Sequence, residues 1–427
     1  MYKNLKDKKL LVIGSDAGTA NIINIARKLG VYTISADGIL DRSKTPAKLA
    51  ADEAWDINYS NTKEIAKLCK EANVDGVLAG YSEYRVLAAC RIARELGLPF
   101  FATEEQILLT RNKRTFKDLC VNFDVPIPKD YCFSYPLTQK ERDSIEFPVI
   151  VKPTDYGGRK GISICFTEEE LDSAMLKAVA SSESSTIIVE DYLEGIEFSS
   201  IYTVSNGKIA LSSINDKYIT DDQEIKTGLC ECLISPSSFC DRYLNEIDKK
   251  IQNLIRDGIK AQNGCVFFQG MITADKIYVF EMGYRTNGNN DYVTIDKYNG
   301  INYMKMLISH SLTGDMADDI SKNNPLFPEK TCTLVLQAHA GEIAVFEYQN
   351  LKSNPKIYDI VNQAWIGKKI LEDGSTAQCV MKVRFTAQTH EELAETINFI
   401  YDNVTVKDAH GNDMLFKRFD TNKLYQK

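Results

Sequence analysis

The chain lacks the features that mark several common protein classes. No apolar run approaches the roughly 18–20 residues of a membrane-spanning helix, and the N-terminus lacks the apolar core of a signal peptide. A net charge of −8 without runs of like charge argues against nucleic acid as the main partner of these 427 residues. We therefore expect a soluble, cytoplasmic protein that acts on small molecules and contacts neither membranes nor nucleic acids.

Cysteine pairs with metal-binding spacing are also missing. The eleven cysteines include no CxxC pair, and the single residue between Cys230 and Cys232 is the wrong spacing for zinc. Cys165 and Cys265 lie in apolar runs, as do most of the others. We expect buried free thiols in a reducing compartment.

Two common nucleotide-binding loops, GxxxxGK[ST] and GxGxxG, are absent. The chain has instead an apolar run, Phe147–Val151, that ends in Lys152. Such a run is typical of a buried strand, so the ammonium at its end needs an anion. A glycine-rich stretch then offers backbone N–H groups to a phosphate, although a solvated turn of a surface hairpin would carry the same glycines. The stretch comprises Gly157, Gly158, Arg159, Lys160 and Gly161.

Further charged residues follow apolar runs along the chain. One strand-like run ends near Glu190, with Glu197 shortly after it, and another ends in Glu281 and Arg285. Upstream of these runs, Lys113 opens a helix-like segment. A cleft for a nucleotide triphosphate needs cations near the phosphates and neutral or acidic groups near the sugar and base, and this set supplies both.

In this order the motifs resemble the ATP-grasp superfamily, and the resemblance covers nearly the whole chain. The alternating C-terminal segment looks like the last domain of ligases related to biotin carboxylase and carbamoyl phosphate synthetase. The resemblance implies a multidomain α/β and α+β fold with three parts. These are a Rossmann-like parallel α/β domain over residues 1–103, an ATP-grasp domain over 104–325 with a mobile lid at about 128–193, and a C-terminal α+β domain over 326–427.

The first unit alternates strand-like and helix-like segments, which predicts a parallel sheet with right-handed crossovers. A glycine pair without GxGxxG is only a weak signal for a dinucleotide. By resemblance the unit helps to bind the acceptor, with Asp16, Asp37 and Glu83 as candidates; the alternative role is helix capping, for Asp16 and Ser82. The expected elements are strands over Lys9–Gly14, Val31–Asp37 and Val74–Ala79, and helices over Ala17–Leu29, Thr62–Ala72 and Glu83–Leu96.

The later units mix strands and helices. Asn206 and Gly207 predict a tight hairpin turn, and Thr167 predicts a helix cap. The expected elements are an amphipathic helix over Leu108–Leu119, two strands within Phe147–Phe166, strands over Thr186–Leu193, Phe198–Val204, Lys208–Ile214, Thr331–Ile343 (with a glycine turn) and Val380–Ala387, and a helix over Thr389–Tyr401.

For ATP, the resemblance implies a division of roles by charge. Lys113 and Lys152 contact the phosphates, and the glycine-rich stretch closes over them. Glu197 accepts from the ribose hydroxyls, because one carboxylate pairs well with two vicinal O–H donors. Lys217 is a further phosphate-facing cation, and Arg285 holds the transferred phosphoryl group or the acyl-phosphate oxyanion; both are catalytic candidates. The residues that border the adenine are Glu190, Asp191, Tyr192 and Leu193.

The metal site departs from the family's pattern. Glu281 is retained, but Gln269 stands where an acid is usual, and Gly283 stands where asparagine is common. Glu281, the Gln269 carbonyl and the ATP phosphates together still offer the oxygen ligands that Mg²⁺ prefers. The following asparagines are either further neutral ligands or a solvated turn; they are Asn287, Asn289 and Asn290.

The implied activity is an ATP-dependent carboxylate–amine ligase. A small carboxylate is activated as an acyl phosphate, and an amine then displaces phosphate. The alternatives are a nucleotide-binding protein with a degenerate metal site, or a carboxylase or carbamoyl-phosphate-type enzyme. His339, on an alternating strand, either faces the active site or packs structurally. The resemblance suggests a homodimer, whereas the sequence itself names neither the oligomeric state nor the substrates.

Overall fold

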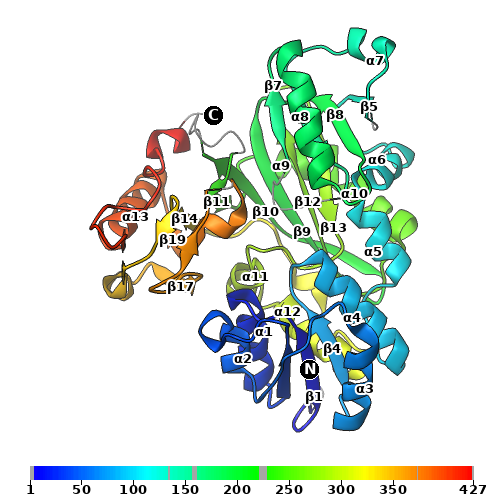
Figure 1. The fold of residues 1–427 in the computed structure, drawn as a ribbon, viewed down its shortest axis with the longest axis vertical. Helices are drawn as coiled ribbons and strands as arrows, with labels where there is room; N and C mark the ends of the chain where they lie inside the picture. Colours follow the sequence, from blue (N-terminus) through cyan, green and yellow to red (C-terminus); the bar gives the residue numbers. More distant parts are fainter. Residues whose placement is uncertain (1–3, 133–134, 156–160, 221–227, 373, 426–427) are drawn as a thin grey trace.

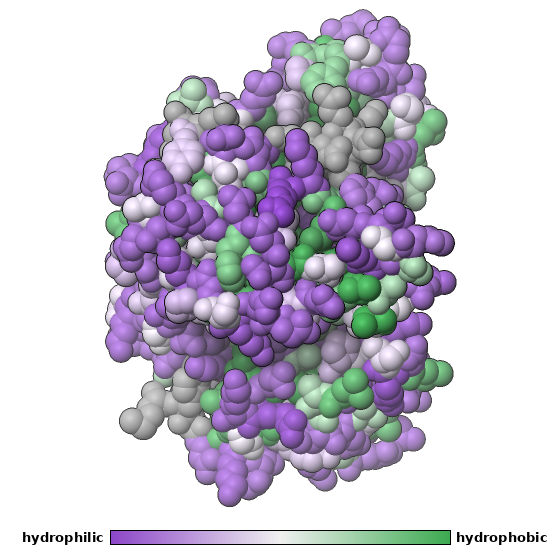
Figure 2. Space-filling model, turned by 90° about the vertical axis from the view of Figure 1, so that its left-hand side faces the viewer, coloured by the Kyte–Doolittle hydropathy of each residue, from purple (hydrophilic) through white to green (hydrophobic). Residues whose placement is uncertain are grey.

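The computed structural model describes residues 4–132, 135–155, 161–220, 228–372 and 374–425. Three regions are visible in Figure 1: the N-terminal unit at the bottom, a small lid at the top, and the C-terminal unit on the left. Hydrophilic residues predominate on the face shown in Figure 2, and hydrophobic residues form small groups there. Within the described residues, no helix combines the length and apolar character needed to cross a membrane.

The N-terminal unit is a parallel sheet in the order β3-β2-β1-β4, as the alternation of elements predicts. Asp16 caps the first helix, because its side chain accepts from the Thr19 amide at 2.9 Å. The predicted cap at Ser82 is wrong: this residue precedes its helix but makes no side-chain capping bond. The elements are β1 Lys9–Ile13, α1 Ala17–Lys28, β2 Tyr32–Ala36, α2 Pro46–Ala50, β3 Glu53–Trp55, α3 Thr62–Ala72, β4 Gly76–Ala79 and α4 Glu83–Leu96.

The predicted helix over Leu108–Leu119 is two helices, α5 Glu104–Arg111 and α6 Lys113–Asn122. Asn112 separates them, since its backbone is extended and its side chain accepts from the amides of Arg114 and Thr115. Asparagine competes with helical hydrogen bonding in this way and favours a new N-terminus. The break places Lys113 in the first turn of α6.

The lid is a four-stranded sheet in the order β5-β8-β6-β7, with a hydrophobic core of its own that includes Val149, Val151 and Met175. Thr167 precedes α8 without making a side-chain capping bond, so this predicted cap is also wrong. The lid elements are β5 Asp130–Cys132, α7 Gln139–Asp143, β6 Val149–Pro153, β7 Ser163–Cys165, α8 Glu168–Ser181 and β8 Ile187–Asp191.

One antiparallel sheet of eight strands forms the centre, in the order β13-β12-β9-β10-β11-β14-β19-β17. The predicted hairpin is confirmed: Asn206 and Gly207 have φ of 51° and 75°, as a two-residue turn requires. The strands are β9 Ile196–Ser205, β10 Lys208–Ile219, β11 Cys230–Ser235, β12 Gly264–Ile272, β13 Ile277–Gly283, β14 Lys330–Gln337, β17 Ile357–Asn362 and β19 Cys379–Ala387.

This sheet continues across residue 326, where we predict a domain boundary. Strands β14, β19 and β17 of the C-terminal unit extend it through β11, while a separate hydrophobic core lies behind them. At the other end α12 packs on β4, and a side chain at Gly76 would lie 2.5 Å from the carbonyl oxygen of Ser311. The N-terminal unit is thereby held against the large sheet, and the boundaries themselves stay a prediction.

Shorter elements complete the fold. The remaining helices are α9 Cys240–Glu246, α10 Asp248–Asn253, α11 Tyr292–Asn299, α12 Tyr303–Thr313 and α13 His390–Asp402, with a π-helical turn at Leu254–Ile259 and 3₁₀ turns at Arg42–Lys44, Ile320–Lys322, Gln349–Ser353, Thr376–Gln378 and Thr421–Leu424. Two small ladders pair β15 Gly341–Glu342 with β18 Lys369–Ile370, and β16 Val345–Glu347 with β20 Thr405–Lys407.

Candidate active site

The lid presents a buried cation, as the sequence predicts. Lys152 lies near the end of β6 and is 4% exposed, and its ammonium pairs with the carboxylate of Glu190 on β8. Glu190 also pairs with Lys117 of α6, which in turn pairs with Asp130 of β5. One carboxylate therefore stands between two lysines.

The environment of this cluster changes its proton affinities. Burial lowers the pKa of Lys152, and although Glu190 opposes the shift, the charges of Lys117 and Lys113 add to it. Burial acts to raise the pKa of Glu190, but the two lysines outweigh it and the pKa lies below its usual value. The ammonium of Lys152 is thus only partly compensated, so it suits an additional anion.

The connection after β8 offers backbone groups to a ligand. The Asp191 carboxylate accepts from the Tyr131 hydroxyl at 2.7 Å, and the Tyr192 amide donates to the Pro148 carbonyl at 3.1 Å. The Leu193 amide has no hydrogen-bond partner in the part of the chain that the structure describes. Of the predicted adenine-bordering groups, the Leu193 amide is therefore the one open to a nucleobase.

Glu197 and Lys217 lie directly opposite each other on β9 and β10. Both are buried, and their side chains form an ion pair at 2.5 Å. The predicted ribose acceptor and the predicted phosphate-facing cation are therefore one unit, in which each sets the position of the other.

The two predicted metal ligands also face each other. Gln269 on β12 lies opposite Glu281 on β13, and neither side chain has a hydrogen-bond or ion-pair partner among the described residues. No group of three His, Cys, Asp or Glu residues suited to a metal occurs in the described ranges. Glu281 and Gln269 would therefore supply two oxygen-bearing side chains to Mg²⁺. Oxygens of a bound phosphate and of water would complete its coordination shell.

The glycine that departs from the family's pattern has a steric cause. A Cβ at Gly283 would lie 2.4 Å from the ring of Phe267, so Phe267 fills the space that a larger residue at 283 would need. The guanidinium of Arg285 lies over the same ring, 4.9 Å from its centre. The aromatic ring therefore occupies the space beside residue 283 and packs against the predicted catalytic arginine.

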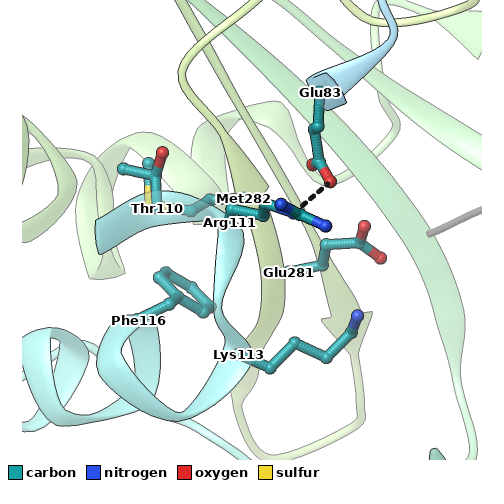
Figure 3. A pocket seen from close by; sticks show the side chains of 7 residues that line it. All are labelled: Glu83, Thr110, Arg111, Lys113, Phe116, Glu281 and Met282. Carbon is teal, nitrogen blue, oxygen red and sulfur yellow. Dashed lines mark ion pairs between the residues drawn. The ribbon is translucent and has the colours of Figure 1, made fainter. Parts of the chain in front are cut away.

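A small pocket lies between the N-terminal unit and α5, α6 and β13 (Figure 3). The charged ends of Glu83, Arg111, Glu281 and Lys113 lie on one side of it. Glu83 accepts from Arg285 at 2.9 Å, and its carboxylate is 4.0 Å from Nε of Arg111. The lining residues are Glu83, Thr110, Arg111, Lys113, Phe116, Glu281 and Met282.

Arg111 and Lys117 belong to this site, and sequence reasoning missed both. Arg111 stacks on Tyr84 with 4.2 Å between guanidinium and ring centre, and it also pairs with Glu183 at 2.9 Å. A local signal for Lys117 existed, because it lies four residues after Lys113 on α6 and so shares a helix face with it. No such signal marks Arg111, whose partners lie far away in the sequence.

The other predicted residues fall in several places. Asp16 and Asp37 both pair with Arg85, so these acceptor candidates lie together. Nδ1 of His339 lies 2.7 Å from the Glu372 carboxylate, and the imidazole ring packs against Phe416. Neither neighbour is a predicted site residue. Of the glycine-rich stretch only Gly161 is described, with φ of 78°. The other predicted members lie outside the described residues: Gly157, Gly158, Arg159 and Lys160.

The asparagines after β13 form a buried turn in which side chains bond to one another. Asn287 donates to Asp291 and accepts from the Asn289 amide, and Asn290 is buried. Burial raises the pKa of Asp291. Asn287 and Asn290 are thus buried, Asn289 is half-buried, and the amide oxygen of Asn287 already accepts one hydrogen bond.

Comparison with known proteins places this arrangement in a family. Residues 111–290 match the family model of the phosphoribosylglycinamide synthetase ATP-grasp (A) domain. These residues therefore resemble an ATP-grasp domain. The matched range begins at the end of α5 and ends after β13, so it contains all the predicted nucleotide and metal residues.

Relatives agree over the rest of the chain. Phosphoribosylamine–glycine ligase of Fusobacterium nucleatum is 23% identical over 82% of this chain and 83% of its own length. The crystal structure of an L-amino acid ligase from Bacillus licheniformis aligns over 94% of this chain and 99% of its own, with TM-score 0.78 and 16% identity. The biotin carboxylase domain dimer of the Hydrogenobacter thermophilus 2-oxoglutarate carboxylase, in complex with MgADP, ADP and bicarbonate, aligns over 96% and 91%, with TM-score 0.78 and 17% identity. These two structures confirm the multidomain fold.

Proposed function

We propose that this ATP-grasp protein is an ATP-dependent ligase that joins a small carboxylate to an amine and releases ADP and phosphate. The observation that carries the proposal is the meeting of Lys113 with Glu281 in one pocket, beside the lysine cluster of the lid. Cations suited to a triphosphate therefore lie beside the carboxylate of Glu281, which has no protein partner among the described residues. The relatives that form C–N bonds favour this activity over the alternatives.

The reaction has two steps. An oxygen of the substrate carboxylate attacks the γ-phosphorus of ATP, so that an acyl phosphate forms and ADP leaves. The amine nitrogen then attacks the acyl carbon, loses a proton and expels inorganic phosphate. Such chemistry needs positioning and charge neutralisation more than covalent help from the protein.

The side chains divide these tasks. Lys113 and Lys152 hold the phosphates, and Lys217 is directed toward them by its pair with Glu197. Arg285 is anchored by Glu83 and stabilises the phosphoryl group or the acyl-phosphate oxyanion. Glu190 holds Lys152, and the Leu193 amide contacts the adenine.

Glu281 and Gln269 are the residues that would hold Mg²⁺, whose charge neutralises phosphate oxygens when it is bound. The side-chain oxygens of both residues are free of protein partners in the described ranges, which suits this role. Asp16, Asp37 and Glu83 lie on the N-terminal unit and help to place the second substrate. From the resemblance to this family we further propose a soluble, cytoplasmic protein that acts on small molecules as a homodimer.

A second function has one observation in its favour. A site with a single carboxylate ligand binds Mg²⁺ more weakly than one with two, which suits a protein that binds nucleotide without turning it over. Measurement of ADP and phosphate with Mg-ATP and pools of amino acids or other small carboxylates separates the two. The Lys152→Ala variant serves as the blank. ADP and phosphate that appear with one pool alone support the ligase, and tight ATP binding without turnover in any pool refutes it.

A further inference from the structure

Lys382 is a buried cation for which the protein supplies no carboxylate. The residue is 8% exposed, and its ammonium donates at 2.7 Å to the carbonyl oxygen of Gly288. Within the described residues it forms no ion pair. By contrast, other buried cations do face carboxylates: Lys48 faces Asp56, Lys117 and Lys152 face Glu190, Lys217 faces Glu197, and Arg384 faces Asp359.

A buried ammonium is costly unless an anion or several oxygen atoms compensate it. One backbone carbonyl is weak compensation for a full charge. Asp291 is an acid whose charge interacts with Lys382, but no ion pair joins the two among the described residues, and its carboxylate accepts a hydrogen bond from Asn287. An anion from outside the protein is therefore the missing partner.

Lys382 shares a sheet face with the proposed ATP site. Residues directly opposite in a ladder point to the same face of a sheet. On β14, Val335 lies opposite Lys382 of β19 and shares a face with Thr333. From Thr333 the pairs run to Leu233 of β11, to Lys217 of β10 and finally to Glu197 of β9. The cation thus lies along the same surface as the nucleotide residues, three strands from Lys217.

The N-terminal unit closes the region from the other side. The ring of Tyr81 lies between the start of α1 and the turn after β13, because Cβ atoms at Gly18 and Gly288 would lie 2.5 Å and 3.9 Å from it. Tyr81 also interacts with Asp16 and with Cys379, at the start of β19. Tyr81 therefore contacts both the acceptor candidate Asp16 and the turn whose Gly288 carbonyl binds Lys382, at a junction of the three units.

A second unsatisfied donor lies on the same face. Arg384 is two residues further along β19 and fully buried, and its Nε has no hydrogen-bond partner among the described residues. Its charge is already balanced by Asp359. Among the described ion pairs, Lys382 is thus the cation of this face without a paired carboxylate, and a single ammonium suits a monoanion such as a carboxylate.

We propose that Lys382 binds the non-reacting carboxylate of the amine substrate, which is accordingly an α-amino acid or a close analogue. The inference rests on the proposed function and adds its substrate class. The proposal assigns to Lys382 a carboxylate of the amine substrate, which is a different group from the carboxylate that ATP activates. The product consequently keeps a free carboxylate, as in a dipeptide.

The first test is binding without ATP. The melting temperature is measured with each of the twenty common amino acids and with the corresponding amino acid amides, which keep the ammonium and lose the carboxylate. The proteins are the wild type, Lys382→Met, and Lys369→Met as a control at an exposed lysine of the same unit. We expect at least one amino acid to raise the melting temperature of the wild type and of Lys369→Met by a few degrees. Its amide, and either ligand with Lys382→Met, should have no effect.

The proposal is overturned if no amino acid stabilises the wild type, if amide and acid act equally, or if Lys382→Met keeps the response. The comparison of acid with amide needs only the wild type, so it stands even where Lys382→Met fails to fold. Turnover then separates the two proposals. Where an amino acid supports ADP release, Lys382→Met should raise its KM by roughly 10- to 100-fold and leave the KM for ATP nearly unchanged. Amino acid binding without any ADP release would refute the ligase reaction and leave the role of Lys382 intact.

Discussion

Substitution of Lys152 should mainly lower activity, whereas substitution of Glu190 should mainly lower the stability of the lid. Glu190 pairs with both Lys152 and Lys117, and Lys117 has a second partner in Asp130. Lys152→Met leaves Glu190 with Lys117. Glu190→Gln leaves Lys152 buried without a carboxylate, while Lys117 keeps Asp130.

The magnitudes follow from this connectivity. Removal of one partner of a buried ion pair costs about 3–5 kcal/mol when the other is left unpaired, which describes Glu190→Gln. Lys152→Met should cost no more than about 1 kcal/mol, because it also removes a charge that burial disfavours. The double variant should resemble Lys152→Met. Activity should be lowered more by Lys152→Met than by Glu190→Gln. Loss of the charged phosphate contact of Lys152 should cost about 1.5–3 kcal/mol, or roughly 10- to 150-fold in kcat/KM.

Amide hydrogen exchange in β6 and β8 reports the stability of the lid separately from the rest of the chain. We expect exchange to be roughly 100-fold faster in Glu190→Gln and nearly unchanged in Lys152→Met and in the double variant. ADP release reports activity in the same samples. Equal destabilisation by both single variants, or additive effects in the double variant, would refute the assigned network.

Three further predictions concern single features. Glu281→Gln should abolish Mg-dependent ADP release while the melting temperature stays within about 2 °C, because this carboxylate has no protein partner in the described ranges; a large loss of stability would count against the metal role. Gly283→Asn should destabilise the protein by about 2–3 kcal/mol through the ring of Phe267, and the same substitution should cost much less in a Phe267→Ala background; a double-mutant cycle by denaturant unfolding checks this, and equal costs in both backgrounds would contradict it. The lowered pKa of Glu190 stabilises the lid above its unfolded pKa of about 4.3, and this contribution is lost as the pH falls through the folded pKa. Hydrogen exchange between pH 5 and 3 should therefore accelerate more in the wild type than in Glu190→Gln, and parallel pH profiles would contradict the assignment.

Local patterns in the sequence were sufficient for most elements and for the buried lysine. Apolar alternation located β6 and placed Lys152 at its end, and asparagine–glycine located the β9–β10 turn. Signals of this kind depend on neighbours in the chain. The break at Asn112 shows their limit, because amphipathic spacing continues through a residue whose side chain ends the helix.

Pairings between distant residues were out of reach. Glu83 and Arg285 are 202 positions apart, and nothing local marks them as partners. Sequence reasoning likewise assigned Glu197 and Lys217 to different parts of ATP, although the ladder places them opposite each other. The glycine at 283 was identified as a departure, but its cause, the ring of Phe267, depends on the register of β12 and β13.

We propose that the pocket lined by Lys113 and Glu281 supports transfer of the γ-phosphoryl group of ATP to a carboxylate. Nucleotide analysis after incubation with Mg-ATP and separate pools of small carboxylates, with Lys152→Ala as the blank, tests it most directly. We expect ADP and phosphate in equal amounts, with one pool and not with the others, and neither product with the variant. AMP and pyrophosphate, or bound ATP that stays intact with every pool, would contradict it.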